Sequence, residues 1–257
     1  MTGERTHRGE RPTSATVAAE LPTGLPAGSR IEPAALPGGG DLLLVPVAPT
    51  AAAALLPQLL AWAEQSDNVV PPVVVELYGT LVLWTPRRAA VASPADRLPR
   101  ATAAVTEFTV TAAELGEIER AIAGLWRNYE ADLPCGFAVT AADAGRVPEL
   151  AERYRQSMSL AGRLARLSPR IHQPPQHPPT LAGQLGERLR DRCRLADREE
   201  FADDQLEAIV RLYESCGQRT SDRLLAQREH VLTWVIVLLL AAETVLLLVD
   251  LLATAGG

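Results

Sequence analysis

The sequence predicts an α+β protein, in which a small mixed domain is followed by long helices and one C-terminal transmembrane helix. Three observations lead to this fold class. Short apolar and β-branched runs lie between residues 41 and 84, proline-free charged stretches follow residue 180, and residues 231–252 are almost wholly apolar. Strands and helices are expected in mixed order, which is typical of α+β domains.

The first forty residues are rich in Pro, Gly, Thr and Ala and lack the apolar core of a signal peptide, so disorder is expected there. Residues 41–48 (DLLLVPVA) predict a short buried strand, and the Ala/Leu-rich residues 50–64 predict a helix. Residues 73–78 and 80–84 are apolar and β-branched. They predict two strands joined tightly by one glycine, or one bent strand.

Four further elements are expected before the first proline-rich stretch. Residues 102–110 alternate apolar and polar side chains, which predicts another strand. A capping-box spacing opens a predicted helix over 111–129. Residues 135–139 are expected to form a short strand, and a weaker cap starts a helix over 140–167.

Residues 168–180 hold five prolines in thirteen positions, which predicts an extended spacer. Residues 181–230 lack proline and are dense in Arg, Glu and Asp, so one or two amphipathic helices are expected. An apolar stripe within them indicates either a coiled-coil seam or a face that packs against the α+β domain. The stripe comprises Leu206, Ile209, Tyr213, Cys216 and Thr220.

The predicted organisation is therefore a series of six segments. They are a disordered segment (1–40), a cytosolic α+β domain (41–167), a proline-rich spacer (168–180), an amphipathic helical region (181–230), a transmembrane helix (231–252) and a short extracytosolic tail (253–257).

Residues 231–252 predict a single membrane span. Fifteen of these 22 residues are Leu, Ile or Val, which favours insertion by about 7 kcal/mol against about 3 kcal/mol for an acid at the centre. A buried soluble helix is the alternative for such a run. Arg219, Arg223 and Arg228 precede the span, so the positive-inside rule places the N-terminus in the cytosol.

Glu243 lies near the centre of the predicted span. An ionisable group at this depth normally faces another helix or a wet cavity. Glu243 and Trp234 are therefore the candidate intramembrane or assembly residues. The alternative is an acid that stays protonated or reaches the interface. Asp250, closer to the end of the span, is expected at the interface.

Two stretches resemble motifs of the "required for meiotic nuclear division" family. Residues 73–85 (VVVELYGTLVLWT) contain an aromatic-Gly pair before an apolar run that ends in Trp, and residues 228–245 (REHVLTWVIVLLLAAETV) contain a Leu-x-Trp, an aliphatic run and a glutamate. The resemblance implies a non-enzymatic, tail-anchored and oligomeric protein. The matching positions are Tyr78, Gly79, Trp84, Leu232, Trp234 and Glu243.

No catalytic, cofactor-binding or metal-binding residues are predicted. Cys135 as a nucleophile competes with its simpler interpretation as a small apolar residue of a strand, which is favoured. His172 and His177, with Cys193, could bind a metal, but the two histidines lie in the spacer without neighbouring carboxylates.

The composition limits the remaining classes of function. A net charge of −6 without a basic block argues against nucleic-acid binding. Three widely spaced cysteines fit a reducing compartment.

The sequence therefore favours a membrane scaffold or adaptor that contacts lipid through its anchor and binds copies of itself or a protein partner through its cytosolic region. A membrane sensor or effector, whose assembled anchors perturb the bilayer, is the first alternative. An enzyme in the α+β domain is the second.

Overall fold

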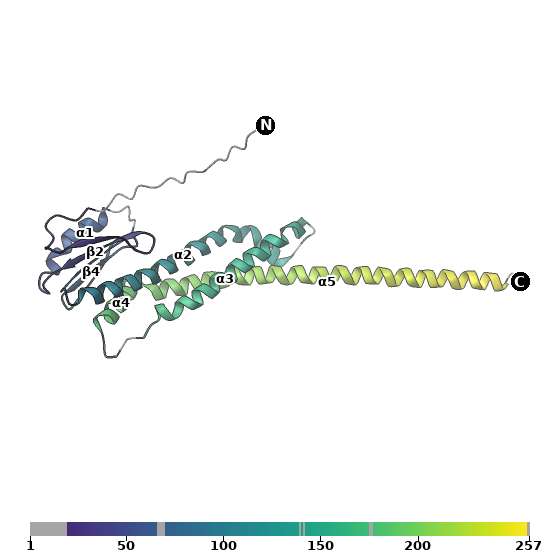
Figure 1. Ribbon diagram of the computed structural model, residues 1–257. Coiled ribbons are helices and arrows are strands. Elements are labelled where there is room, and N and C mark those ends of the chain that lie inside the picture. The colour runs from purple at the N-terminus through teal and green to yellow at the C-terminus, as the bar shows by residue number, and fades with distance from the viewer. Residues whose placement is uncertain (1–19, 66–69, 139, 141, 175–176, 256–257) are drawn as a thin grey trace, which may run out of the picture. The chain divides into compact units, whose positions relative to one another are not determined.

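The computed structural model describes residues 20–65, 70–138, 140, 142–174 and 177–255 (Figure 1). A small mixed sheet and several long helices make an α+β fold, as predicted. The chain forms two compact units. The sheet unit comprises Met1–Ala113 and Gln173–Arg194, and the helical unit comprises Glu114–His172 and Leu195–Gly257.

The sheet has five strands in the order β1-β2-β5-β4-β3. β2 and β5 pair in parallel, whereas every other neighbouring pair is antiparallel. The strands are β1 (Arg30–Leu36), β2 (Gly40–Pro46), β3 (Val73–Leu77), β4 (Thr80–Trp84) and β5 (Arg88–Ser93).

Helices cover both faces of the sheet. On one face, Leu59 and Trp62 of α1 (Leu56–Glu64) pack on alternate residues of β2, β4 and β5. On the other face, Trp84 of β4 meets the first part of α2, where its ring centroid lies 4.9 Å from that of Phe108 and its indole Nε1 donates a 2.9 Å hydrogen bond to Thr109 Oγ1. Central strands that are buried on both sides need nearly continuous apolar sequence, which is what made β2 and β4 recognisable.

α4 (Leu181–Arg192) packs along the edge strand β3 within the sheet unit. Thr180 caps this helix, because its hydroxyl accepts a 3.1 Å hydrogen bond from the Gly183 amide. α4 belongs to the same unit as a strand more than a hundred residues earlier in the chain.

The helical unit contains the second part of α2 (Leu98–Phe137), the 3-10 turn η2 (Ala142–Arg146), α3 (Val147–Ile171) and α5 (Leu195–Ala255). α2 and α5 run in the same direction and α3 runs against them. Pairs between the helices establish these directions: Glu119–Arg198 and Trp126–Gln205 join α2 to α5, and Glu114–Arg170 and Asp132–Arg153 join α2 to α3.

The predicted apolar stripe of the helical region is an interior face. Leu206, Ile209, Tyr213 and Cys216 are 0–2% exposed, and α5 packs closely against α3. Of the two alternatives for this stripe, packing against the preceding part of the chain is the one that the structure shows.

Several predicted elements are wrong. Residues 102–110 and Cys135 lie in α2 and not in strands. β1 falls inside the segment that was expected to be disordered, of which residues 1–19 lie outside the described residues. α3 continues to Ile171, past the start of the predicted spacer, and residues 175–176 of that spacer also lie outside the description.

Candidate functional site

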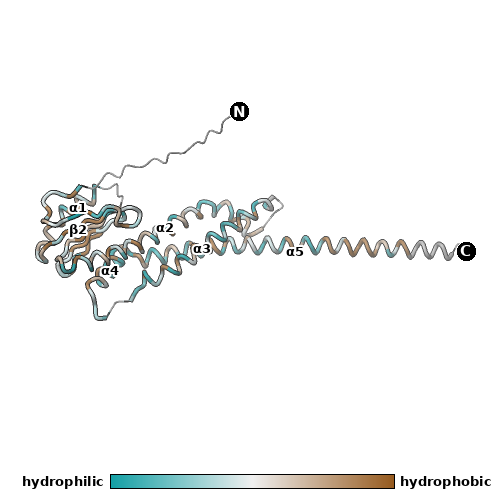
Figure 2. Tube along the Cα trace, viewed as in Figure 1, coloured by the Kyte–Doolittle hydropathy of each residue, from teal (hydrophilic) through white to brown (hydrophobic). Residues whose placement is uncertain are grey.

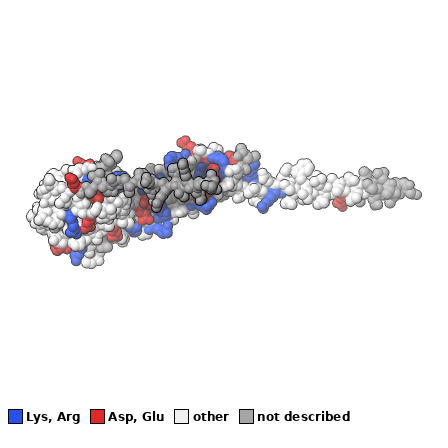
Figure 3. All heavy atoms as spheres, turned by 45° about the horizontal axis from the view of Figure 1, so that its top comes forward, with Lys and Arg blue, Asp and Glu red and all other residues white. Residues whose placement is uncertain are grey.

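α5 contains a candidate membrane span. Among the described residues it is the one helix long and apolar enough to cross a bilayer. Its large apolar side chains between residues 231 and 246 are 47–70% exposed, so this part of α5 is not covered by any other described part of the chain. Figure 2 shows the apolar stretch as the brown part of α5, and in Figure 3 few charged side chains interrupt it.

The predicted anchor residues lie along this exposed part of α5. Leu232 is 61% exposed and Trp234 is 58% exposed. The Trp234 indole Nε1 donates a 3.1 Å hydrogen bond to His230 Nε2 one turn earlier. Glu243 is exposed near the middle of the apolar stretch. These residues share one helix, but no other described segment of the chain packs against them.

The other residues that carried the family resemblance occupy a hairpin turn and the core of the sheet unit. Tyr78 and Gly79 connect β3 to β4 with left-handed φ angles of 49° and 72°, as a two-residue type I′ turn requires. Glycine is needed at position 79, because an added Cβ would lie 2.6 Å from Pro49 Cβ. Trp84 is 6% exposed. These three residues therefore have structural roles within the sheet unit.

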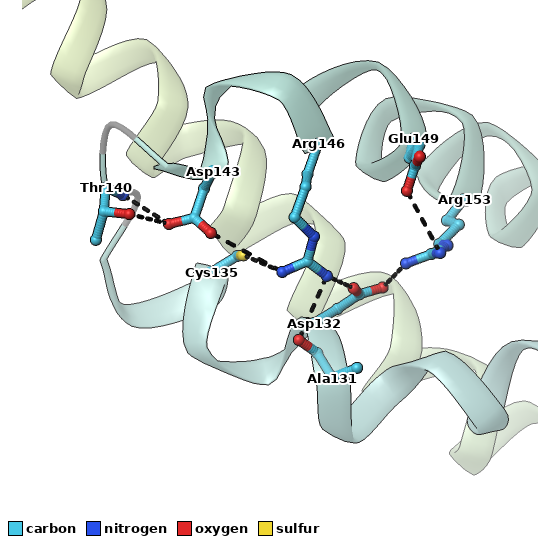
Figure 4. A network of polar contacts seen from close by, with 8 residues as sticks. All are labelled: Ala131, Asp132, Cys135, Thr140, Asp143, Arg146, Glu149 and Arg153. Carbon is cyan, nitrogen blue, oxygen red and sulfur yellow. Dashed lines mark hydrogen bonds and ion pairs between the residues drawn. The ribbon is translucent and has the colours of Figure 1, made fainter.

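A buried carboxylate in the helical unit was not predicted from the sequence. Asp132 of α2 is fully buried and pairs with two arginines, at 2.5 Å from Arg146 Nη2 and through a second short bond from Arg153 Nη1 (Figure 4). Tyr213 of α5 donates a third hydrogen bond of 3.0 Å. One carboxylate thus joins α2, η2, α3 and α5.

Neighbouring groups complete this polar network. Arg146 Nη1 also lies 3.7 Å from Cys135 Sγ and 3.9 Å from Asp143 Oδ1. Thr140 donates both its amide and its hydroxyl to Asp143, and these hydrogen bonds lower the pKa of that carboxyl. The network holds the α2–α3 connection in place with charge-assisted hydrogen bonds.

Burial favours the neutral forms of the Tyr213 hydroxyl and of the Cys135 and Cys216 thiols. It raises the pKa of Tyr213, with a further contribution from the hydrogen bond to Asp132. Burial raises the pKa of the Cys135 thiol and raises that of Cys216 to about 11. A nucleophilic cysteine needs a lowered pKa, so the environment of Cys135 favours its structural interpretation.

The candidate metal ligands are divided between the two units. His172 Nε2 lies 3.1 Å from Glu199 Oε2 in the helical unit, whereas His177 and Cys193 belong to the sheet unit. No group of three His, Cys, Asp or Glu side chains suited to a metal occurs among the described residues.

Among the described residues, a surface hollow is found in each unit. In the sheet unit a polar hollow of about 300 Å³ lies between the turn at Tyr78 and the charged face of α4. In the helical unit an apolar hollow of about 330 Å³, here called the α2–α5 groove, lies between those two helices. The groove is lined by Tyr129, Leu133, Gly136, Phe137, Ala208, Arg211, Leu212 and Ser215.

No family model, curated protein or solved structure matches this chain. The resemblance to the "required for meiotic nuclear division" family therefore stays a prediction from the sequence.

Proposed function

We propose that the protein is a membrane-anchored scaffold or adaptor. The observation that carries this proposal is the continuity of α5. Its first part is buried among the helices of the helical unit, and the same helix continues without a break into exposed, almost wholly apolar residues. A soluble protein gains nothing from a long apolar helix in water, whereas a bilayer provides the apolar surroundings that such a helix needs.

The proposed orientation follows from the charges beside the span. Arg219, Arg223 and Arg228 lie within about three turns before residue 231, and the positive-inside rule retains such residues in the cytosol. Both compact units then lie on the cytosolic side, where a scaffold meets soluble partners. The buried thiols of Cys135 and Cys216, which form no disulfide, agree with that compartment.

A scaffold also needs a surface that binds. The α2–α5 groove is apolar, open and located in the same unit as the anchor. In contrast, the Asp132 carboxylate is buried and its charge is paired with Arg146 and Arg153 of the same unit. This arrangement suits a role in holding helices together better than a role in binding a substrate. These observations favour a binding function over an enzymatic one.

Carbonate extraction of membranes from expressing cells tests the anchor. The full chain is expected in the membrane pellet, and a chain that lacks residues 231–257 in the supernatant. A matched control keeps the length: Leu239→Arg with Leu240→Arg adds about 7 kcal/mol to an insertion free energy of about −4 kcal/mol, so this variant is also expected to be released. Extraction of the full chain by carbonate would refute the anchor.

A further inference from the structure

The α2–α5 groove lies where α2 and α5 approach each other closely and small residues form part of its lining. Gly136 provides no side chain, and a Cβ at this position would come within 2.9 Å of Leu212 Cδ1. Ala208 and Ser215 are the neighbouring small residues on α5. Leu212, which is 6% exposed, therefore forms an apolar floor.

Phe137 lies at the rim of this groove. It is 74% exposed, more than any other large apolar side chain that the structure describes. Leu133, one turn earlier on α2, is 37% exposed at the same groove. An isolated surface phenylalanine requires no explanation, but one beside an apolar hollow of matching chemistry is typical of a docking surface.

We propose that the groove is the interface between two copies of this chain, with Phe137 of each copy inserted into the groove of the other. This inference rests on the proposed membrane anchor, which forces both copies to stand parallel in the same bilayer. A two-fold axis along the membrane normal then brings identical patches together at equal height. Gly136, Leu133 and Leu212 lie within about one helical turn of Phe137, so the side chain and its receiving site meet at that height.

The charges at the rim are self-complementary. Arg211 at the groove and Glu207 one turn earlier form an exposed ion pair on α5, with side chains that are 73% and 57% exposed. A two-fold related copy presents the same pair, so each arginine approaches the partner copy's carboxylate as well as its own. A groove with a single sign of charge would instead repel its own copy.

The first test compares two phenylalanines on the helical unit. Full chains carrying either a donor or an acceptor fluorophore are reconstituted into phosphatidylcholine vesicles, and energy transfer is followed as the lipid is diluted. Phe137→Asp is expected to weaken association at least about thirtyfold, as removal of an interface anchor does. Phe201→Asp, at a position that is 65% exposed in α5 away from the groove, is expected to have no effect.

The second test locates the contact and does not depend on a destabilising variant. A photoreactive benzoylphenylalanine replaces Phe137 in chains made with natural isotopes, which are mixed with ¹⁵N-labelled parent chains. The expected product joins position 137 of a light chain to the peptide that contains Leu212 of a heavy chain. Links confined to one chain, or to a different protein, would overturn the proposal and assign the groove to another occupant.

The outcomes separate this inference from the proposed function. If the parent fails to float with vesicles, the anchor is refuted, and the same energy-transfer pairs in detergent micelles still decide whether copies associate. If the parent floats but shows no energy transfer, or if Phe137→Asp associates as the parent does, the anchor stands and the groove proposal fails.

Discussion

Removal of the Asp132 carboxylate is expected to loosen the helical unit while leaving the sheet unit intact. Asp132 is fully buried, and Asp132→Ala leaves Arg146 and Arg153 without their shared counter-charge and the Tyr213 hydroxyl without its acceptor. Breaking a buried pair costs about 3–5 kcal/mol. The two arginines retain 37% and 23% of their exposure, so solvent offsets part of that cost and we expect about 3 kcal/mol.

Hydrogen exchange followed by mass spectrometry measures this loss in one unit at a time. A change of about 3 kcal/mol corresponds to roughly 150-fold faster exchange in peptides of α3 and the buried part of α5, with peptides of the β-sheet unchanged. Glu152→Gln is the matched control, because Glu152 forms an exposed pair with Arg155 worth at most about 1 kcal/mol. If Asp132→Ala accelerates exchange by less than about fivefold, the Asp132 network does not hold the helices of this unit together.

Three further predictions address other parts of the chain. Stability of the helical unit in urea is expected to fall as pH rises from 9 to 11. The Cys216 thiol contributes up to about 1.4 kcal/mol per pH unit to this fall, because it titrates near 9.0 when unfolded and at about 11 when folded. Cys216→Ala should reduce the slope, and equal slopes would contradict the assignment. Gly79→Ala is expected to lower the melting temperature, since it combines a left-handed φ with a clash against Pro49, whereas Tyr78→Gly is expected to maintain or raise it. Glu243→Leu is expected to weaken cross-linking between anchors in membranes by about 0.6–2 kcal/mol and Glu243→Gln to preserve it; equal cross-linking by all three forms would make Glu243 a tolerated acid.

Elements that are buried on two faces or are very apolar could be predicted from the sequence. β2, β4 and the apolar part of α5 are runs of large aliphatic residues, which need apolar surroundings on nearly all sides. β5 could not be recognised, because its sequence RAAVAS carries little strand propensity. Its buried alanines instead provide the flat surface on which α1 packs.

The prediction of a strand over residues 102–110 is wrong, because the apolar residues there repeat with the period of a helix and not of a strand. Thr and Val suggested alternation, but Ala101, Val105, Phe108, Ala112 and Leu115 are buried at spacings of four and three, which is the helical pattern. Threonine is tolerated in α2 because its hydroxyl can donate a hydrogen bond to a backbone carbonyl of the preceding turn. Thr109 donates such a bond of 2.7 Å to the Val105 carbonyl.

β1 and the Asp132 network required information that the local sequence lacks. β1 contains Pro33 and a left-handed Ala34, features that argue against a strand except at the edge of a sheet, where the register with β2 shifts. Asp132 stands in an apolar stripe of α2, which signals a buried charge. Its partners Arg146, Arg153 and Tyr213 are 14, 21 and 81 residues away, so only the fold brings them together.

α5 connects the groove to the proposed span as one unbroken helix, which limits how a bound partner can move relative to the membrane. From Ser215 to residue 231 the helix rises about 24 Å, and no proline interrupts it. A flexible linker would let the bound partner rotate freely, whereas a continuous helix fixes the height and direction of the groove above the bilayer. The rigid helix also transmits motion from the membrane, because a tilt or rotation of the span turns the helical unit with it. A membrane sensor needs that coupling, so the continuity of α5 is the observation that keeps the sensor or effector as the second candidate function.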